Sequence, residues 1–437
     1  MLPVRGRLKP LSVPAFPRLL GSYTVNETGD SVGIVALALL VYERTHDVAP
    51  TAAFFVAAKF LPAIVSPVVT ARVDRLALRW TLPALYVAEA LIFAALALVA
   101  AGTFFLPLVL VLGFMDGTLA LTGRSLTRGA VAAVLKPPGL LREGNALMNI
   151  GFAVATVGGS ALAGLLVAVF GLSTALLVDA ASFLVIAVML SLTRGLPAVE
   201  VTSEGWGERL RAGVAFARDN LLVRVLLAGQ ALAMVLFTLI IPIEVFYARE
   251  TLGTTSAGFG VLLAAWGAGI VLGSVAFLAL KHRSTVTLIM TSTSAIGLAY
   301  LGMSVADTLS VACLLSVLGG AGNGVQWIAV MTALQEATPE PLQARVAGFL
   351  ESIGAAMPGV GYIIGGAITS LTSPRAAYAV AGGGTIALVV IMGLLSPRVR
   401  SRLELRSSDA NQPPTAVVVD ALLATGSRAA EPDLARE

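Results

Sequence analysis

Long hydrophobic runs separated by short polar connections make up most of this chain. Each run holds about 20 residues, the length at which a helix rising about 1.5 Å per residue crosses roughly 30 Å of hydrocarbon. Twelve such runs predict an all-α integral membrane protein with twelve transmembrane helices. Their approximate ranges are 19–42, 51–71, 81–101, 104–123, 145–169, 173–193, 222–246, 256–280, 285–304, 309–334, 346–370 and 376–395.

The first predicted span carries three polar residues in its cytoplasmic half, in the stretch YTVNETGDSVG. Asn26, Glu27 and Asp30 are three and four residues apart, so they share one helix face. A charge at mid-bilayer costs roughly 2.5 kcal/mol or more, so this face must look at protein or water. Asp30 and Glu27 are therefore candidates for proton coupling. The alternative is a buried ion pair that only fixes helix packing.

Lys59 lies in the second predicted span, at about the same depth as Asp30. An ammonium group at that depth needs a partner. We expect an Asp30–Lys59 contact, direct or through water. If the pair breaks during a transport cycle, Asp30 can carry a proton; a permanent pair would be structural, and both alternatives stay open.

Other polar residues also fall inside predicted spans. Asp116, in the fourth span, is the second midplane acid and the second candidate proton carrier; alternatively it is a hydrogen-bonded packing acid. Asp179, in the sixth span, is predicted to lie close to the outer interface and to be structural. The candidates for a polar substrate path are Asn26, Gln230, Asn323, Gln326 and Trp327.

Composition and charge placement agree with a membrane protein. The chain is 57% hydrophobic and only 12% charged. Soluble domains carry roughly 25% charged residues. With a cytoplasmic N-terminus, 25 of the 29 lysines and arginines fall inside and only Arg44, Arg249 and Arg375 fall outside. This asymmetry predicts a multi-pass protein of the plasma membrane with both termini cytoplasmic. Positive charge spread over separate loops argues against nucleic-acid binding, despite the net charge of +4.

The pattern divides the chain into a lead-in at 1–18, helices over 19–193, a linker at 194–221, helices over 222–395 and a tail at 396–437. The linker is predicted to contain an amphipathic helix on the cytoplasmic membrane face, and the tail to be disordered. An offset of 203 residues superposes Arg142 on Arg345 and Gly158 on Gly361. The halves therefore predict two pseudo-symmetric six-helix bundles, with a substrate site where they meet.

Several chemistries are excluded by the residues present. The single cysteine, Cys313, rules out a disulfide framework, and His46 and His282 are too far apart to suggest a metal site. The chain contains no G-x-x-x-x-G-K-[ST] loop, so ATP is not the expected energy source. We predict no enzymatic activity, no cofactor and no metal.

Specific motifs resemble those of the major facilitator superfamily, in the branch of enterobactin-exporter-like and macrolide-efflux-like transporters. TARVDRLALRW is similar to the family's loop between helices 2 and 3, with Asp74, Arg75 and Arg79 matching and Thr70 in place of glycine. Further matches are AAKFLP, LLREGNAL, VDAASFL and LQEATPEPLQARVAGF, which holds Arg345. The glycine-rich stretch GFAVATVGGSALAGLL is similar to the exporters' antiporter motif, with Ser160 in place of its proline.

The resemblance implies a secondary transporter that works by alternating access, with helices 1, 4, 7 and 10 lining the cavity. We also expect the protein to be a monomer. It implies a proton-coupled exporter of an amphipathic small molecule, such as a drug or a siderophore-like compound. It also implies a cytoplasmic gate of Asp74, Arg75, Arg79 and Arg345, although these charges could simply set topology. The alternatives are an ion-independent lipid or lysolipid flippase and a non-transporting membrane scaffold of the same fold.

Overall fold

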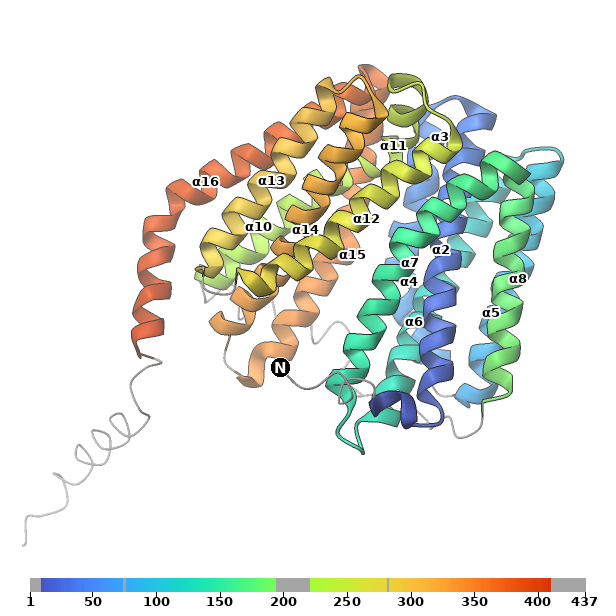
Figure 1. Cartoon of the computed structure of the whole chain (residues 1–437), viewed down its shortest axis with the longest axis horizontal. Coiled ribbons are helices and arrows are strands. Elements are labelled where there is room, and N and C mark those ends of the chain that lie inside the picture. Colours follow the sequence, from blue (N-terminus) through green and yellow to red (C-terminus); the bar gives the residue numbers. More distant parts are fainter. Residues whose placement is uncertain (1–8, 74–75, 194–220, 281–282, 339, 410–437) are drawn as a thin grey trace, which may run out of the picture. The chain divides into compact units, whose positions relative to one another are not determined.

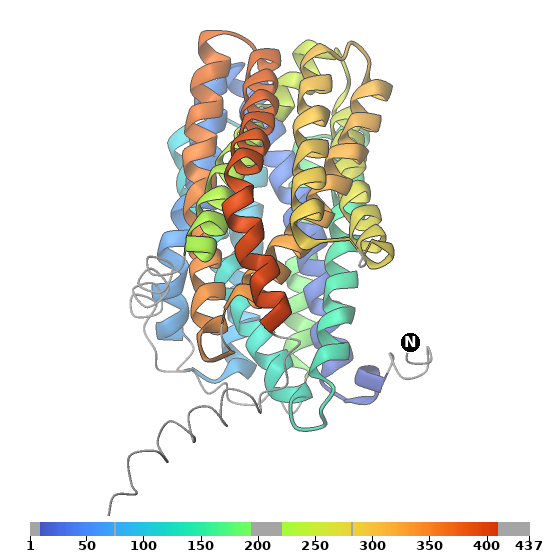
Figure 2. The same cartoon turned by 90° about the vertical axis from the view of Figure 1, so that its left-hand side faces the viewer.

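The computed structural model describes residues 9–73, 76–193, 221–280, 283–338 and 340–409. The described part contains twelve helical segments that are long and apolar enough to cross a membrane, as the hydrophobic pattern predicts. The chain forms two compact units, Met1–Val389 and Val390–Glu437. Within the first unit the long helices run alongside one another, as Figures 1 and 2 both show. The predicted linker at 194–221 lies almost entirely outside the described residues.

A short 3-10 helix, η1 (Lys9–Ser12), precedes the first half. Its first span is α2 (Phe16–Thr45), and the second is a continuous helix built from α3 (Val48–Phe55), η2 (Val56–Phe60) and α4 (Leu61–Val73). The remaining four spans of this half are α5 (Leu78–Ala101), α6 (Leu106–Leu135), α7 (Leu141–Phe170) and α8 (Leu172–Ser191).

The second half begins with α10 (Leu221–Thr238), which continues through η3 (Ile241–Ile243), α11 (Glu244–Phe246) and η4 (Tyr247–Thr251). Side-chain oxygens of Thr255, Ser284 and Thr308 cap the N-termini of the next three spans. These spans are α12 (Ser256–Ala279), α13 (Thr285–Val305) and α14 (Leu309–Ala337), followed by α15 (Glu340–Leu371) and α16 (Pro374–Asp409).

Two helices extend well beyond their apolar runs. Helix α6 continues to Leu135 rather than ending near residue 123, because Leu126, Ala130 and Val131 keep a buried apolar stripe at helical spacing. Helix α16 continues to Asp409, so the predicted tail at 396–437 begins with a helix, and residues 410–437 lie outside the described part.

The long helices pack mainly within their own half. In the first half α2 contacts α6, α7 and α8, and α5 contacts α6 and α8; in the second half α14 contacts α10, α12 and α13, and α10 contacts α15. The most extensive contacts between the halves are those of α7 with α12 and of α15 with α3 and η2, and the seventh span adds contacts of η3 with α3 and of α11 with α2. Small residues allow this closeness, since a Cβ on Gly164 of α7 would meet the Ser256 carbonyl and Gly260 of α12.

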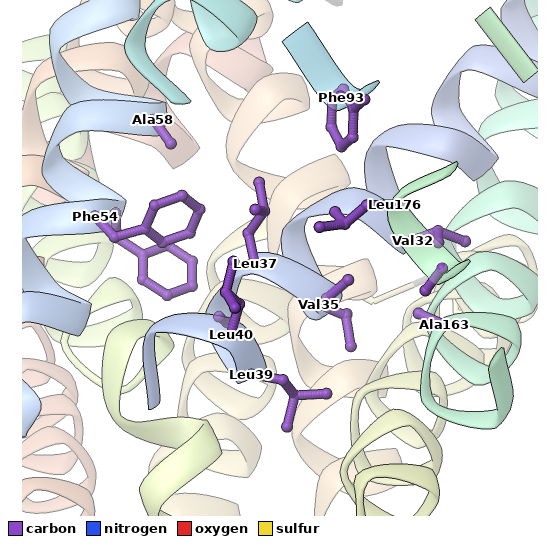
Figure 3. Close-up of a cluster of buried hydrophobic side chains, with 14 of the residues drawn as sticks. Val32, Val35, Leu37, Leu39, Leu40, Phe54, Ala58, Phe93, Ala163 and Leu176 are labelled. Carbon is purple, nitrogen blue, oxygen red and sulfur yellow. The ribbon is translucent and has the colours of Figure 1, made fainter. Parts of the chain in front are cut away.

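The hydrophobic core lies around the C-terminal half of α2. Val35, Leu37, Leu39 and Leu40 are buried there with Phe54 of α3, as Figure 3 shows. Large apolar side chains elsewhere point outward, and Leu98 and Leu314 are 74% and 72% exposed. Because a bilayer solvates such side chains, the exposed apolar surface agrees with a multi-pass membrane protein.

Candidate functional site

An ion-pair network joins the first and fourth spans of the first half. Arg124 of α6 places Nε 2.7 Å from Glu27 Oε1 and a terminal guanidinium nitrogen 3.0 Å from Asp30 Oδ2. Asn26 donates a longer hydrogen bond, 3.4 Å, to the same Asp30 oxygen. The polar face predicted on α2 therefore exists, and one guanidinium holds two carboxylates on it.

The described residues show no direct Asp30–Lys59 ion pair, because the Asp30 carboxylate pairs with Arg124 instead. The contact through water stays a prediction, since both side chains line one cavity. Depth along the membrane can be counted from the sequence, but the direction in which each side chain points cannot. The fourth apolar run stops at Gly123, so hydrophobicity alone places Arg124 in a cytoplasmic loop. In the structure α6 continues past Gly123 to Leu135, so Arg124 faces α2.

Lys59 instead lies in the π-helical turn η2, exposed and without a salt-bridge partner among the described residues. Pro62 explains the turn, since proline has no amide hydrogen to donate to the Ala58 carbonyl four residues earlier. That carbonyl faces Gly117 of α6, where a Cβ would collide with it. The turn thus brings η2 tightly against α6 and sets the direction of the Lys59 side chain.

A polar cavity of about 350 Å³ collects these groups. Asp30, Lys59, Asp116 and Arg124 all line it, together with residues of α15 that include Pro358. The cavity is therefore bounded by the first four spans, the third through Phe93 of α5, and by a helix of the second half. Of the sequence candidates for proton coupling, Asp30 and Asp116 line this cavity, and Glu27 is paired directly behind it.

Asp116 is a second carboxyl in this cavity, and its Oδ1 is buried with no hydrogen-bond partner. Two further acids are buried behind α2: Glu89 of α5 and Asp179 of α8 are each 1% exposed. The Asp179 carboxyl packs against Gly29 and Gly33, where a Cβ would meet its oxygens. Asp179 therefore lies level with Asp30 near the middle of α2, not close to the outer interface as predicted.

The second half holds a smaller polar cavity, about 240 Å³, lined by residues of α10, α13, α14 and α16. Gln326 of α14 donates a 2.7 Å hydrogen bond to Gln230 Oε1 of α10, and both side chains are 5% exposed. Asn323 and Trp327 line the same cavity. The structure thus brings together four of the five residues predicted for a substrate path, and the fifth, Asn26, lies on α2 beside Asp30.

The predicted cytoplasmic gate is described only at Arg79. Its guanidinium lies 5.5 Å from the centroid of the neighbouring Trp80 ring, and the side chain is exposed. Asp74 and Arg75 lie outside the described residues, and of Arg345 only the backbone, within α15, is described. The gate therefore stays a prediction.

Twelve spans, with a cavity beside the first and fourth spans of each half, are the arrangement expected of a transporter with the major facilitator fold. The family model described as transmembrane secretion effector matches residues 5–424, and the chain belongs to that family.

Known proteins agree with this assignment. The chain is 26% identical over 298 residues to the enterobactin exporter EntS of Shigella dysenteriae serotype 1 (strain Sd197), covering 67% of this chain and 70% of that protein. The EntS of Escherichia coli O139:H28 matches with the same identity and coverage.

Solved structures share the fold at low identity. A mutant of the nucleoside transporter NupG superposes with a TM-score of 0.72 at 13% identity, covering 87% of this chain and 99% of NupG. A bacterial homologue of the human lysosomal transporter Spinster, in an inward-facing and unoccupied conformation, superposes with a TM-score of 0.66 at 15% identity. The match covers 90% of this chain and 97% of that homologue. At these identities the likeness shows the fold alone.

Proposed function

We propose that this protein exports an amphipathic, siderophore-like small molecule by alternating access, coupled to proton entry. The observation that carries the proposal is one guanidinium, Arg124, shared by Glu27 and Asp30 at the wall of a polar cavity. The enterobactin exporters among the relatives support both the direction and the kind of substrate.

The shared guanidinium suggests how a proton and a substrate exchange. Asp30 has the longer contact to Arg124 and the more exposed carboxylate, 12% against 4% for Glu27. Proton uptake on Asp30 would cancel its charge and release one side of Arg124, which stays held by Glu27. The freed donor can then bind a substrate oxygen, so the proton and the substrate would compete for the same group.

Asp116 is the second proton carrier in this proposal, because it opens on the same cavity without an ion partner of its own among the described residues. The amide and indole groups of the second half complete the substrate path. Alternating access requires the two halves to rock against each other, and close contacts such as Gly164 with α12 suit that motion.

The remaining parts of the proposal rest on the charge pattern. We assign both termini to the cytoplasm from the positive-inside distribution, and the gate to Asp74, Arg75, Arg79 and Arg345 from the resemblance. We further propose that the protein works as a monomer in the plasma membrane, with the cavities formed by one chain.

The test is transport in proteoliposomes with enterobactin as the probe. An imposed pH gradient should drive enterobactin against the proton flow, and Asp30→Asn should remove the response to the gradient. Asp307→Asn is the matched control, because Asp307 is 80% exposed and pairs with Arg375 outside the cavity. Equal gradient responses in wild type, Asp30→Asn and Asp116→Asn would show that these carboxyls do not couple transport to protons.

A further inference from the structure

A large apolar groove, about 700 Å³, lies on three of the helices that bound the polar cavity of the first half: the second span, α6 and α15. Ala53 and Ala57 of the second span, Phe114 of α6, and Ile363 and Ala367 of α15 line it. Its wall is aliphatic and aromatic apart from Ser370. The lining residues of the second span run from Ala49 to Leu61. At about 1.5 Å per residue this is about 18 Å of helix, a length that accommodates an extended dodecyl chain.

The groove and the polar cavity are neighbours along each of these helices. In the second span the groove residue Ala57 precedes Ala58 and Lys59 of the cavity. In α6 the groove ends at Phe114, and the cavity begins at Asp116. In α15 Tyr362 of the cavity precedes Ile363 of the groove. An amphiphile lying along these helices would therefore place its two ends in different chemical surroundings.

Two acids and two bases line the polar cavity, and Lys59 is the most exposed of the four. Lys59 is exposed and unpaired among the described residues, and the Arg124 side chain is 27% exposed. The acids are more deeply placed, since Asp30 is 12% exposed and already paired. Asp116 Oδ1 is buried. A negatively charged group entering the cavity would therefore meet the Lys59 ammonium first.

We propose that the cavity and the groove form one site for a single-chain anionic amphiphile taken from the bilayer. Its carboxylate, phosphate or sulfate head pairs with Lys59, and its alkyl chain lies in the groove between α3, α6 and α15. This inference rests on the proposed transport function and narrows its substrate class. Residues of the π-helical turn η2 line both the polar cavity and the apolar groove. The turn therefore fixes the distance between the site for the ligand's head group and the site for its alkyl chain.

Displacement of dansyl-undecanoic acid from the full-length protein in lipid nanodiscs tests the site, with empty nanodiscs as the blank. Dodecanoate should displace the probe at a concentration about tenfold lower than dodecanol or dodecyltrimethylammonium, since a charge-assisted contact contributes at that level. Butanoate should displace it poorly, because it has the head without the chain. Equal potency of dodecanoate and dodecanol would overturn the role of Lys59.

Two variants separate the compartments. Lys59→Gln should lower the affinity for dodecanoate about tenfold and leave the affinity for dodecanol unchanged. Lys59→Arg keeps the positive charge and should retain most of the affinity for dodecanoate. Ala53→Phe should fill the groove and weaken both dodecyl ligands alike. Lys9→Gln and Ala84→Phe are the matched controls, because these exposed residues line neither compartment. If both controls weaken binding as much as the site variants, the proposed site is wrong.

The outcome is separable from that of the proton-coupling test. Enterobactin flux under a pH gradient depends on Asp30 in the proposed function, whereas dodecanoate binding depends on Lys59 and Ala53. Loss of the gradient response in Asp30→Asn together with unaltered dodecanoate binding in Lys59→Gln would leave the transport function standing and refute the anionic-amphiphile site.

Discussion

The two halves of this transporter join the same pair of helices with different chemistry. In the first half the first and fourth spans are held by the Glu27–Arg124 ion pair, and in the second half by the Gln230–Gln326 hydrogen bond, each at 2.7 Å. At the repeat offset of 203 residues, Gln230 occupies the position of Glu27, and Arg124 falls on Trp327, directly after Gln326. One end of the bridge therefore stands at the same repeat position in both halves, the other end is shifted by one residue, and the charge differs.

This difference in charge predicts that the two halves respond differently to pH. An amide pair keeps its charge state over the physiological pH range, so the second half offers fixed donors and acceptors to a ligand. Two carboxylates on one guanidinium can gain or lose a proton and rearrange. Among the described residues of these two cavities, charged groups line only that of the first half. We therefore expect pH to act through α2 and α6, and substrate shape to be sensed partly by α10 and α14.

The largest effect should come from removing the central cation. Arg124→Ala leaves Glu27 and Asp30 without a counter-ion in a mostly buried site, which should lower the free energy of unfolding by about 3 kcal/mol. Gln326→Ala removes one neutral hydrogen bond and should cost only about 1 kcal/mol. Thermal unfolding of both variants in the same detergent measures the contrast.

A compensating variant checks the cause. If uncompensated charge is responsible, Arg124→Ala combined with Glu27→Gln and Asp30→Asn should recover much of the lost stability. If the Arg124→Ala and Gln326→Ala variants are equally stable, the ion pair and the amide pair contribute equally to stability. The contrast between the halves would then be one of sequence only.

Exchanging the chemistry between halves should have an intermediate effect. Gln230→Glu places a carboxylate in a cavity whose described residues include no cation. Burial of that charge should destabilise the protein by about 2 kcal/mol near neutral pH. Protonation of the new carboxyl removes its charge, so this loss should shrink as the pH is lowered. The reciprocal change, Glu27→Gln, keeps an acceptor for Arg124 and should cost less. Unfolding midpoints across pH compare them, and equal losses at every pH would contradict the assignment of a neutral second half.

The sequence was sufficient for the spans because about 20 apolar residues are required to cross a bilayer whatever they pack against. It was also sufficient for the polar positions, since Asp30, Asp116, Gln230 and Gln326 interrupt those runs and must therefore face the interior. Which polar side chains contact each other was harder to predict. The depth of a residue in the membrane can be counted along a helix, but the direction in which its side chain points depends on how neighbouring helices pack.

Arg124 and Lys59 show where this limit lies. Arg124 follows the end of an apolar run, so hydrophobicity places it in a loop, although the amphipathic stripe from Leu126 onwards continues the helix. The orientation of Lys59 depends on the π-helical turn before Pro62, which redirects the side chains after it. Extending the helix search past the apolar run would have found Arg124. The turn depends on tertiary contact with Gly117 as well as on Pro62.

The smallest effect should come from the aromatic wall of the second cavity. Trp327 is 42% exposed and lines that cavity. Trp327→Phe should therefore remove part of an apolar contact and weaken enterobactin binding about threefold. Because the contact is uncharged, the ratio of wild-type to variant affinity should stay the same at low and high salt. Binding that relies on cations of the first half should weaken as salt rises, since exposed charges are screened beyond about 10 Å at about 0.1 M. Titrations of wild type and Trp327→Phe at two salt concentrations separate these contributions. A salt-dependent affinity ratio would mean that Trp327 acts through the charged half, and the proposed division of labour between the cavities would fail.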